Sequence, residues 1–103
     1  MDRIEKILVL LGKNPGDNFL RHALALEYIK MGNDGDAKEL FIAILTNSPD
    51  YIGSYYHLAK LLERNRQIDA ATEWYEKGMA AARKVSDNHA YNELNSAYHE
   101  LVD

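Results

Sequence analysis

The feature that most constrains this chain is its similarity to itself at a shift of 34 residues. The shift aligns apolar and turn-forming positions: Pro15 with Pro49, Leu24 with Leu58, Ala25 with Ala59, Ala37 with Ala71, Glu39 with Glu73, Tyr28 with Leu62 and Phe41 with Tyr75. A period of this length is the mark of a supersecondary unit that buries its apolar face against neighbouring copies. The sequence therefore predicts stacked repeats and an extended core instead of a single spherical one.

Within each copy, apolar residues recur at spacings of three and four, which is typical of amphipathic helices, and no segment alternates like a strand. Turn-forming residues interrupt the pattern at 14–17, 32–36 and 47–50. We expect six helices, over residues 2–13, 17–31, 35–46, 51–65, 68–84 and 86–101. Since the connections are short, neighbouring helices should pair as antiparallel hairpins.

The repeat resembles the tetratricopeptide repeat, whose signature is W-x2-L-G-x2-Y, then A-x3-F, then P, within about 34 residues. The first copy carries Arg21-x2-Leu24-Ala25-x2-Tyr28, Ala37-x3-Phe41 and Pro49, and the second carries Tyr55-x2-Leu58-Ala59-x2-Leu62 and Ala71-x3-Tyr75. The resemblance implies an all-α, right-handed superhelix of antiparallel helix pairs in one domain. It covers repeat 1 at residues 18–51 and repeat 2 at residues 52–84.

The two ends of the chain depart from the repeat pattern. Residues 1–14 are expected to form the second half of an earlier repeat, because Pro15 holds the place of a closing proline. Residues 86–102 are expected to form a C-terminal capping helix that covers the open end of the stack. In that helix, Asn92 and Glu93 fall where Leu and Ala should be.

Three further departures are arginines. Arg21 takes the aromatic position of the first copy, Arg66 stands where a turn glycine would be, and Arg83 replaces the closing proline of the second copy.

Small residues are expected where paired helices cross. Ala25, Ala37, Ala59 and Ala71 should be buried there, between larger neighbours. Gly78 lies inside a predicted helix, where glycine is unfavourable, so close packing should account for it. Trp74, Tyr75 and Met79 are interpreted as core residues of the same helix instead of a cofactor-binding stripe.

Charge and composition exclude several classes of function. With 12 Lys and Arg against 16 Asp and Glu, the formal net charge is −4, which disfavours nonspecific nucleic-acid binding. There is no cysteine, so disulfide and thiolate chemistry are excluded. The longest early apolar run, residues 7–11, is far shorter than a membrane span of about 20 residues. Neither a membrane segment nor a signal peptide is expected, and a cytoplasmic location is the default expectation.

No motif of catalysis or metal binding emerges. The four histidines do not form His-x3-His, and His89 with Glu93, one turn apart, is interpreted as an exposed pair. Asp34 and Asp36 lie in a turn too short for a calcium-binding loop. Phosphate-binding and nucleophile motifs are missing, and the paired carboxylates have no nucleophile beside them. We therefore expect no catalytic residue, no metal site and no cofactor.

The resemblance implies that the first helix of each repeat lines a concave groove for extended peptides. On the predicted helices 17–31 and 51–65, the faces not needed for packing supply the candidate binding residues: Phe19, His22, Leu26, Lys30, Tyr56, His57, Lys60 and Arg64. Leu26 and Ile29 could instead belong to the core. One branch of the family clamps acidic C-terminal tails with Lys, Asn and Arg, but His22, Leu26, Gly53 and His57 occupy the clamp positions and disfavour that activity.

The leading hypothesis is a non-enzymatic module that binds a peptide or protein partner. Lys60 and Arg64 are expected to favour acidic partners. The alternative is a scaffold that forms a homodimer through its terminal helices, because Ile4, Ile7, Leu8 and Leu11 give the first helix an apolar face. A small enzyme or metal-binding protein is a weaker third hypothesis.

Overall fold

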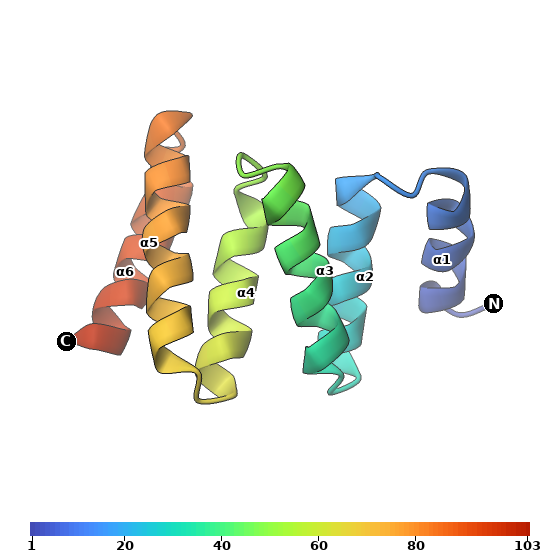
Figure 1. Cartoon of the computed structure of the whole chain (residues 1–103), viewed down its shortest axis with the longest axis horizontal. Helices are drawn as coiled ribbons and strands as arrows, with labels where there is room; N and C mark the ends of the chain where they lie inside the picture. The colour runs from blue at the N-terminus through green and yellow to red at the C-terminus, as the bar shows by residue number, and fades with distance from the viewer. The chain divides into compact units, whose positions relative to one another are not determined.

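The computed structural model describes residues 1–103 as six α-helices joined by short turns, with no strand (Figure 1). The helices are α1 (Arg3–Lys13), α2 (Asn18–Lys30), α3 (Asp34–Asn47), α4 (Gly53–Arg64), α5 (Ile68–Lys84) and α6 (Asn88–Val102). The all-α prediction is confirmed, and every helix was expected within about two residues of its bounds.

Three helices begin at an aspartate whose side chain satisfies a free backbone N–H. The carboxylates of Asp2, Asp17 and Asp87 accept hydrogen bonds from the third residue after each of them, which are Glu5, Leu20 and Ala90. Such caps typically contribute about 1 kcal/mol of helix stability. They explain why α1, α2 and α6 begin where they do.

Three helices are followed, two positions after their last residue, by a residue with positive φ. These residues are Gly32 at 79°, Arg66 at 62° and Ser86 at 58°. After α2, the amide of Gly32 donates to the Ile29 carbonyl and that of Asn33 to the Tyr28 carbonyl. The same pair of bonds follows α4 and α5, so all three ends form the Schellman motif. Arg66 therefore adopts the backbone of the glycine that it replaces.

The chain divides into two compact units, the first of which is Met1–Asn47. In it, α2 and α3 form an antiparallel hairpin and α1 packs against α2 (Figure 1). Ala25 and Ala37 are fully buried, as expected for small residues between paired helices. Around them lie the larger buried side chains Leu24, Phe41, Ile44 and Leu45, and Ile7 is the buried residue of α1.

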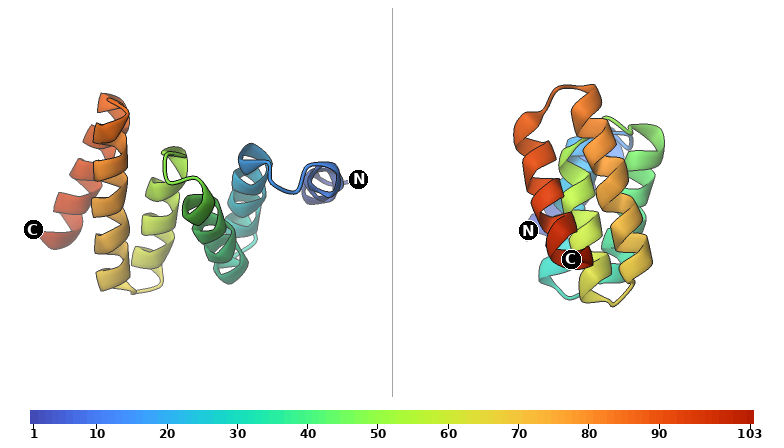
Figure 2. Two further views of the ribbon diagram at one scale, coloured as in Figure 1. Left: turned by 45° about the horizontal axis from the view of Figure 1, so that its top comes forward. Right: turned by 90° about the vertical axis from the view of Figure 1, so that its left-hand side faces the viewer.

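The second unit, Ser48–Asp103, contains α4, α5 and α6, with α5 alongside both neighbours (Figure 2). A Cβ built on Gly78 of α5 would lie 2.7 Å from the Tyr55 Cβ on α4 and 3.0 Å from the Leu94 Cδ1 on α6. The close-packing explanation for Gly78 is confirmed, because only a residue without a side chain allows this approach. Ala59 and Ala71 are also fully buried, as predicted.

The sixth helix follows the repeat at a shift of 36 residues, not 34. With this shift, Leu94 takes the place of Leu58, and Leu94 is buried whereas Asn92 and Glu93 are exposed. The physical reason is the length of α5, which has 17 residues where α3 has 14. This shift explains why Asn92 and Glu93 fall at positions that a shift of 34 residues assigns to Leu and Ala.

Two residues assigned to the core from sequence lie instead at its edge. Tyr75 is fully buried, but Trp74 and Met79 are only partly covered. They flank the buried stripe of α5 on opposite sides, since successive helical residues differ by about 100° in direction. The centre of the Trp74 ring lies 6.1 Å from that of the Tyr55 ring and 4.5 Å from Lys77 Nζ.

Candidate functional site

The candidate binding face of the first unit lies along α2. Phe19 is 72% exposed and Lys30 is exposed, as predicted. His22 is half-buried, with its ring 5.5 Å from the Phe41 ring in an edge-on arrangement. Leu26 is half-buried as well, so it serves partly as core and partly as surface.

An ion-pair network borders this face. Glu27 of α2 accepts Lys30 Nζ at 3.0 Å and Arg3 Nε of α1 at 3.2 Å. The hydrogen bond from Lys30 is the main reason why the pKa of Glu27 lies below its ordinary value. Because Lys30 is already paired, its charge is partly compensated before any partner approaches.

The candidate face of the second unit is a contiguous cluster on α4. The Tyr56 and His57 rings meet edge to face, with centres 5.8 Å apart. Lys60 Nζ lies 5.7 Å from the Tyr56 ring centre, and Arg64 is exposed in the last turn of the helix. The structure thus brings together all four residues predicted on this helix.

His57 is a half-buried ionisable group of this cluster. Burial lowers its pKa below the ordinary value for histidine, against the opposing effect of the Glu93 carboxylate on α6. The imidazole is therefore neutral at pH 7. It presents a partner with an aromatic surface instead of a cation.

The sequence suggested that Lys60 is a basic contact for acidic partners, but in the structure its charge is paired within the protein. Its ammonium group lies 3.5 Å from Glu63 Oε2, and the same carboxylate accepts the Tyr75 hydroxyl. Burial, followed by that hydrogen bond, raises the pKa of Tyr75 well above its ordinary value. Glu63 therefore balances Lys60 within the protein, which leaves Arg64 as the other basic side chain of the cluster.

Sequence reasoning missed the exposed row of α6. At a shift of 36 residues, the four cluster residues of α4 correspond to Asn92, Glu93, Ser96 and Glu100, and all four are exposed. The signal that could have found them is the pairing of Tyr55 with Tyr91 and of Leu58 with Leu94 at that shift. The helix expected only to cap the stack thus carries an exposed polar row at the positions that the cluster occupies on α4.

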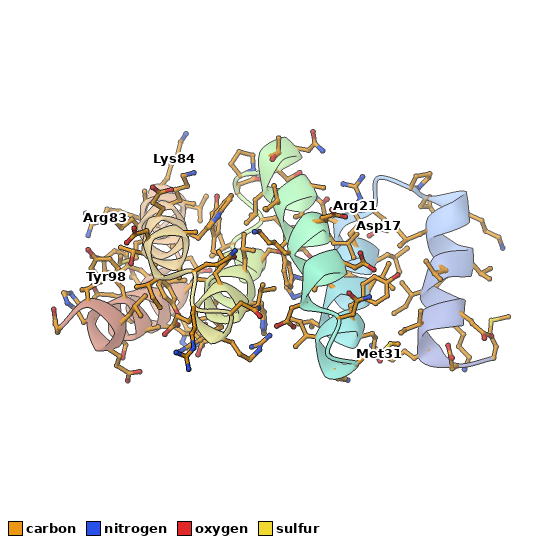
Figure 3. All side chains as sticks on the ribbon, turned by 60° about the horizontal axis from the view of Figure 1, so that its bottom comes forward. Asp17, Arg21, Met31, Arg83, Lys84 and Tyr98 are labelled. Carbon is orange, nitrogen blue, oxygen red and sulfur yellow. The ribbon has the colours of Figure 1, made fainter.

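A separate open hollow of about 280 Å³ lies between α2 and α3. Its lining consists of Arg21, Leu24, Tyr28, Asp36, Glu39, Leu40 and Ala43. Arg21, near Asp17 in the N-terminal half of α2 (Figure 3), donates its Nε–H to the Pro15 carbonyl. Tyr55 donates to the Pro49 carbonyl in the equivalent place of the second repeat, so Arg21 performs the structural task of the missing aromatic residue.

None of the helices has a run of apolar residues long enough to cross a membrane. No group of three or more His, Asp or Glu side chains is arranged to hold a metal ion.

Helix hairpins repeated at 34 residues, with small buried residues at fixed places and matching exposed faces, define a helical repeat protein. A family model for the tetratricopeptide repeat matches residues 52–84. The solution structure of a tetratricopeptide repeat domain protein from Salinibacter ruber is 39% identical, with a TM-score of 0.82, over 85% of this chain and 89% of that one. This chain belongs to the tetratricopeptide repeat family.

Two further solved structures agree with this fold. A crystal structure of a tetratricopeptide repeat domain protein from Salinibacter ruber is 39% identical, with a TM-score of 0.78, over 82% of this chain and 94% of that one. The solution structure of a Bordetella parapertussis protein, 24% identical, has a TM-score of 0.84 over 98% and 88% of the two chains. No curated protein matches the sequence significantly.

Proposed function

We propose that this protein is a non-enzymatic binding module that holds a peptide or protein segment against the exposed faces of its repeat helices. The observation that supports this most is the partly aromatic cluster of Tyr56, His57, Lys60 and Arg64 on α4, in which the first three side chains are half-buried and Arg64 is exposed. Aromatic and arginine side chains are the residues that dominate binding energy at protein interfaces. In α2 the equivalent face carries Phe19, whose large apolar ring is mostly exposed to water.

The family supports the same function, since proteins of this fold generally bind other proteins. The candidate residues lie opposite the buried side of each helix. Leu58, Ala59 and Leu62 face the core, whereas Tyr56, Lys60 and Arg64 do not. Replacing members of the exposed set should therefore alter binding with little effect on folding.

The test is a peptide selected against the full chain from a randomised display library. Replacement of Tyr56 and Arg64 by Ala should weaken its binding at least about tenfold, or roughly 1.4 kcal/mol. Titration calorimetry would measure the affinity, and thermal unfolding would verify the fold. Lys77→Ala, which removes an exposed cation from α5, is the matched control and should leave the affinity unchanged. Equal affinity in a well-folded double variant would place the binding surface elsewhere.

A second candidate function is self-association through α1. Leu8, Val9 and Leu10 are 47%, 49% and 45% exposed, an unusual density of uncovered apolar residues for one short helix. In this case sedimentation of the pure chain would give a dimer, and Val9→Glu would convert it to a monomer. A monomer at all concentrations would refute self-association.

A further inference from the structure

The face shared by α4 and α6 suggests which partners the second unit selects. Three observations of the second unit bear on this question: the position of the α6 row beside α4, the balance of charge across the two helices, and the spacing of two carboxylates. The preference inferred for the second unit rests on the proposed binding function and specifies the chemistry of the peptide that is bound.

The first observation is that acidic groups of α6 face the aromatic cluster of α4. Helices α4 and α6 are in contact, and at the shift of 36 residues Glu93 and Glu100 take the places that His57 and Arg64 have on α4. The Glu93 carboxylate also opposes the effect of burial on the pKa of His57. The α6 row and the α4 cluster thus form one surface, which we call the α4–α6 face.

The second observation is that the carboxylates of α6 are not compensated. Lys60 forms an ion pair with Glu63 on its own helix, and Arg64, the other cation of the α4 cluster, is paired with neither Glu93 nor Glu100. Glu93 and Glu100 are exposed, and neither has a basic side chain within ion-pair distance. A partner that brings positive charge to them would gain attraction, while an acidic partner would be repelled.

The third observation is the distance between the two carboxylate positions. Glu93 and Glu100 are seven residues apart on one helix, which is two turns or about 10.5 Å along the axis. In an extended polyproline II segment, side chains three residues apart lie on the same side, about 9 Å from one another. Lysine and arginine side chains are long and flexible enough to span the small difference.

We propose that the α4–α6 face binds an extended peptide carrying two basic residues three positions apart. Glu93 and Glu100 receive the two cations, and the Tyr56 and His57 rings contact the apolar parts of the peptide beside them. This reverses the preference for acidic partners that Lys60 and Arg64 suggested from sequence.

The experiment compares three full-length proteins: the wild type, the double variant Glu93→Gln/Glu100→Gln, and the control Glu39→Gln/Glu73→Gln. The control removes the same net charge from equivalent exposed positions of α3 and α5. Peptides of about nine residues are selected from a randomised display library against the wild type and measured by fluorescence anisotropy. We expect enrichment of basic residues at positions three apart. Affinity should fall at least about tenfold in the α6 double variant and less than about twofold in the control.

Salt provides a second readout. Binding by the wild type should weaken as ionic strength rises from about 0.05 M to about 0.5 M, because exposed ion pairs are screened. The α6 double variant should lose most of that dependence.

The outcomes separate this inference from the function on which it rests. Selected peptides that are acidic or uncharged, depend on Tyr56 and bind the α6 double variant equally well would leave the binding function standing and overturn the inference. Equal losses of affinity in the two double variants would also overturn the inference, because the change in net charge alone would then explain both losses. If no selected peptide binds the wild type, the binding function fails and the inference fails with it. If Tyr56→Ala leaves the affinity unchanged, the binding surface lies elsewhere and the inference is overturned.

Discussion

Different types of residue make the same contact at equivalent positions of the repeat. Arg21 and Tyr55 differ in chemistry, yet each ties the start of its helix to the carbonyl of the preceding proline. In the third copy Tyr91 is tied to Arg83, whose guanidinium donates to the hydroxyl and lies over the ring. The repeat therefore preserves an anchoring contact more faithfully than it preserves residue types.

Gly78 tests how closely the helices of the second unit approach. Alanine is normally favoured over glycine inside a helix by about 1 kcal/mol. Here its Cβ would lie 2.7 Å from the Tyr55 Cβ, an atom fixed to the α4 backbone, and overpacking of this kind typically costs about 1–3 kcal/mol. We expect Gly78→Ala to lower the free energy of unfolding by about 1 kcal/mol or more, as measured by urea denaturation.

The matched control is Gly12→Ala. A Cβ on Gly12 meets nothing within 4 Å, so this change should be neutral or stabilising. A more stable Gly78→Ala protein would mean that α4 and α5 lie farther apart than described.

Arg66 holds a backbone conformation that favours glycine. Its φ of 62° costs a residue with a side chain about 1 kcal/mol, and the Arg66 side chain is exposed. Arg66→Gly should therefore raise the free energy of unfolding by up to about 1 kcal/mol, seen as a melting temperature higher by a few degrees. The same change at Arg64, inside α4, should be destabilising. A lower free energy of unfolding for both glycine variants would contradict the assignment of the Schellman motif after α4.

At the scale of elements, α6 is both a cover for α5 and a repeat helix in its own right. Leu94 and Ala97 are buried, and the Tyr98 hydroxyl donates a hydrogen bond to the Glu76 carboxylate of α5. Its exposed side is polar, as expected for a terminal helix that must face water. Packing against α5 and display of Glu93 and Glu100 are therefore compatible roles for one helix.

Removal of α6 should expose the apolar side of α5. A chain ending at Lys84 should aggregate or lose cooperative unfolding, as followed by light scattering and circular dichroism. A chain that lacks residues 1–14 serves as the comparison. It should lose less stability than the chain without α6, because α1 buries one residue, Ile7. A monomeric, equally stable chain without α6 would show that its covering role is wrong.

The sequence predicts the boundaries of the helices well. It does not reveal how the greater length of α5 changes the register of the third copy of the repeat. Apolar periodicity and turn residues were enough to place all six helices. The longer α5 shifts the third copy by two residues, and a fixed period of 34 therefore concealed the exposed row of α6. A repeat need not have a constant length, since each copy packs mainly on its neighbour.

At the scale of the whole molecule, stability should be unevenly distributed along the chain. The number of buried residues in an element sets how readily it opens, and α4 buries six residues while α1 buries one. Native-state hydrogen exchange should show the weakest protection in α1 and the strongest in α4 and α5. Uniform protection in all six helices would instead indicate a single cooperative unit.

The sequence by itself determined the fold of this protein and the helices that carry its candidate binding residues. It did so because repeat period, apolar spacing and turn chemistry are local properties that a one-dimensional pattern records. Only the tertiary structure decided the electrostatics of those residues: that Glu63 balances Lys60, that burial keeps His57 neutral, and that Glu93 and Glu100 stand unpaired beside them. The physical reason is that charge and desolvation depend on distances between residues of different helices, and those distances are set by packing.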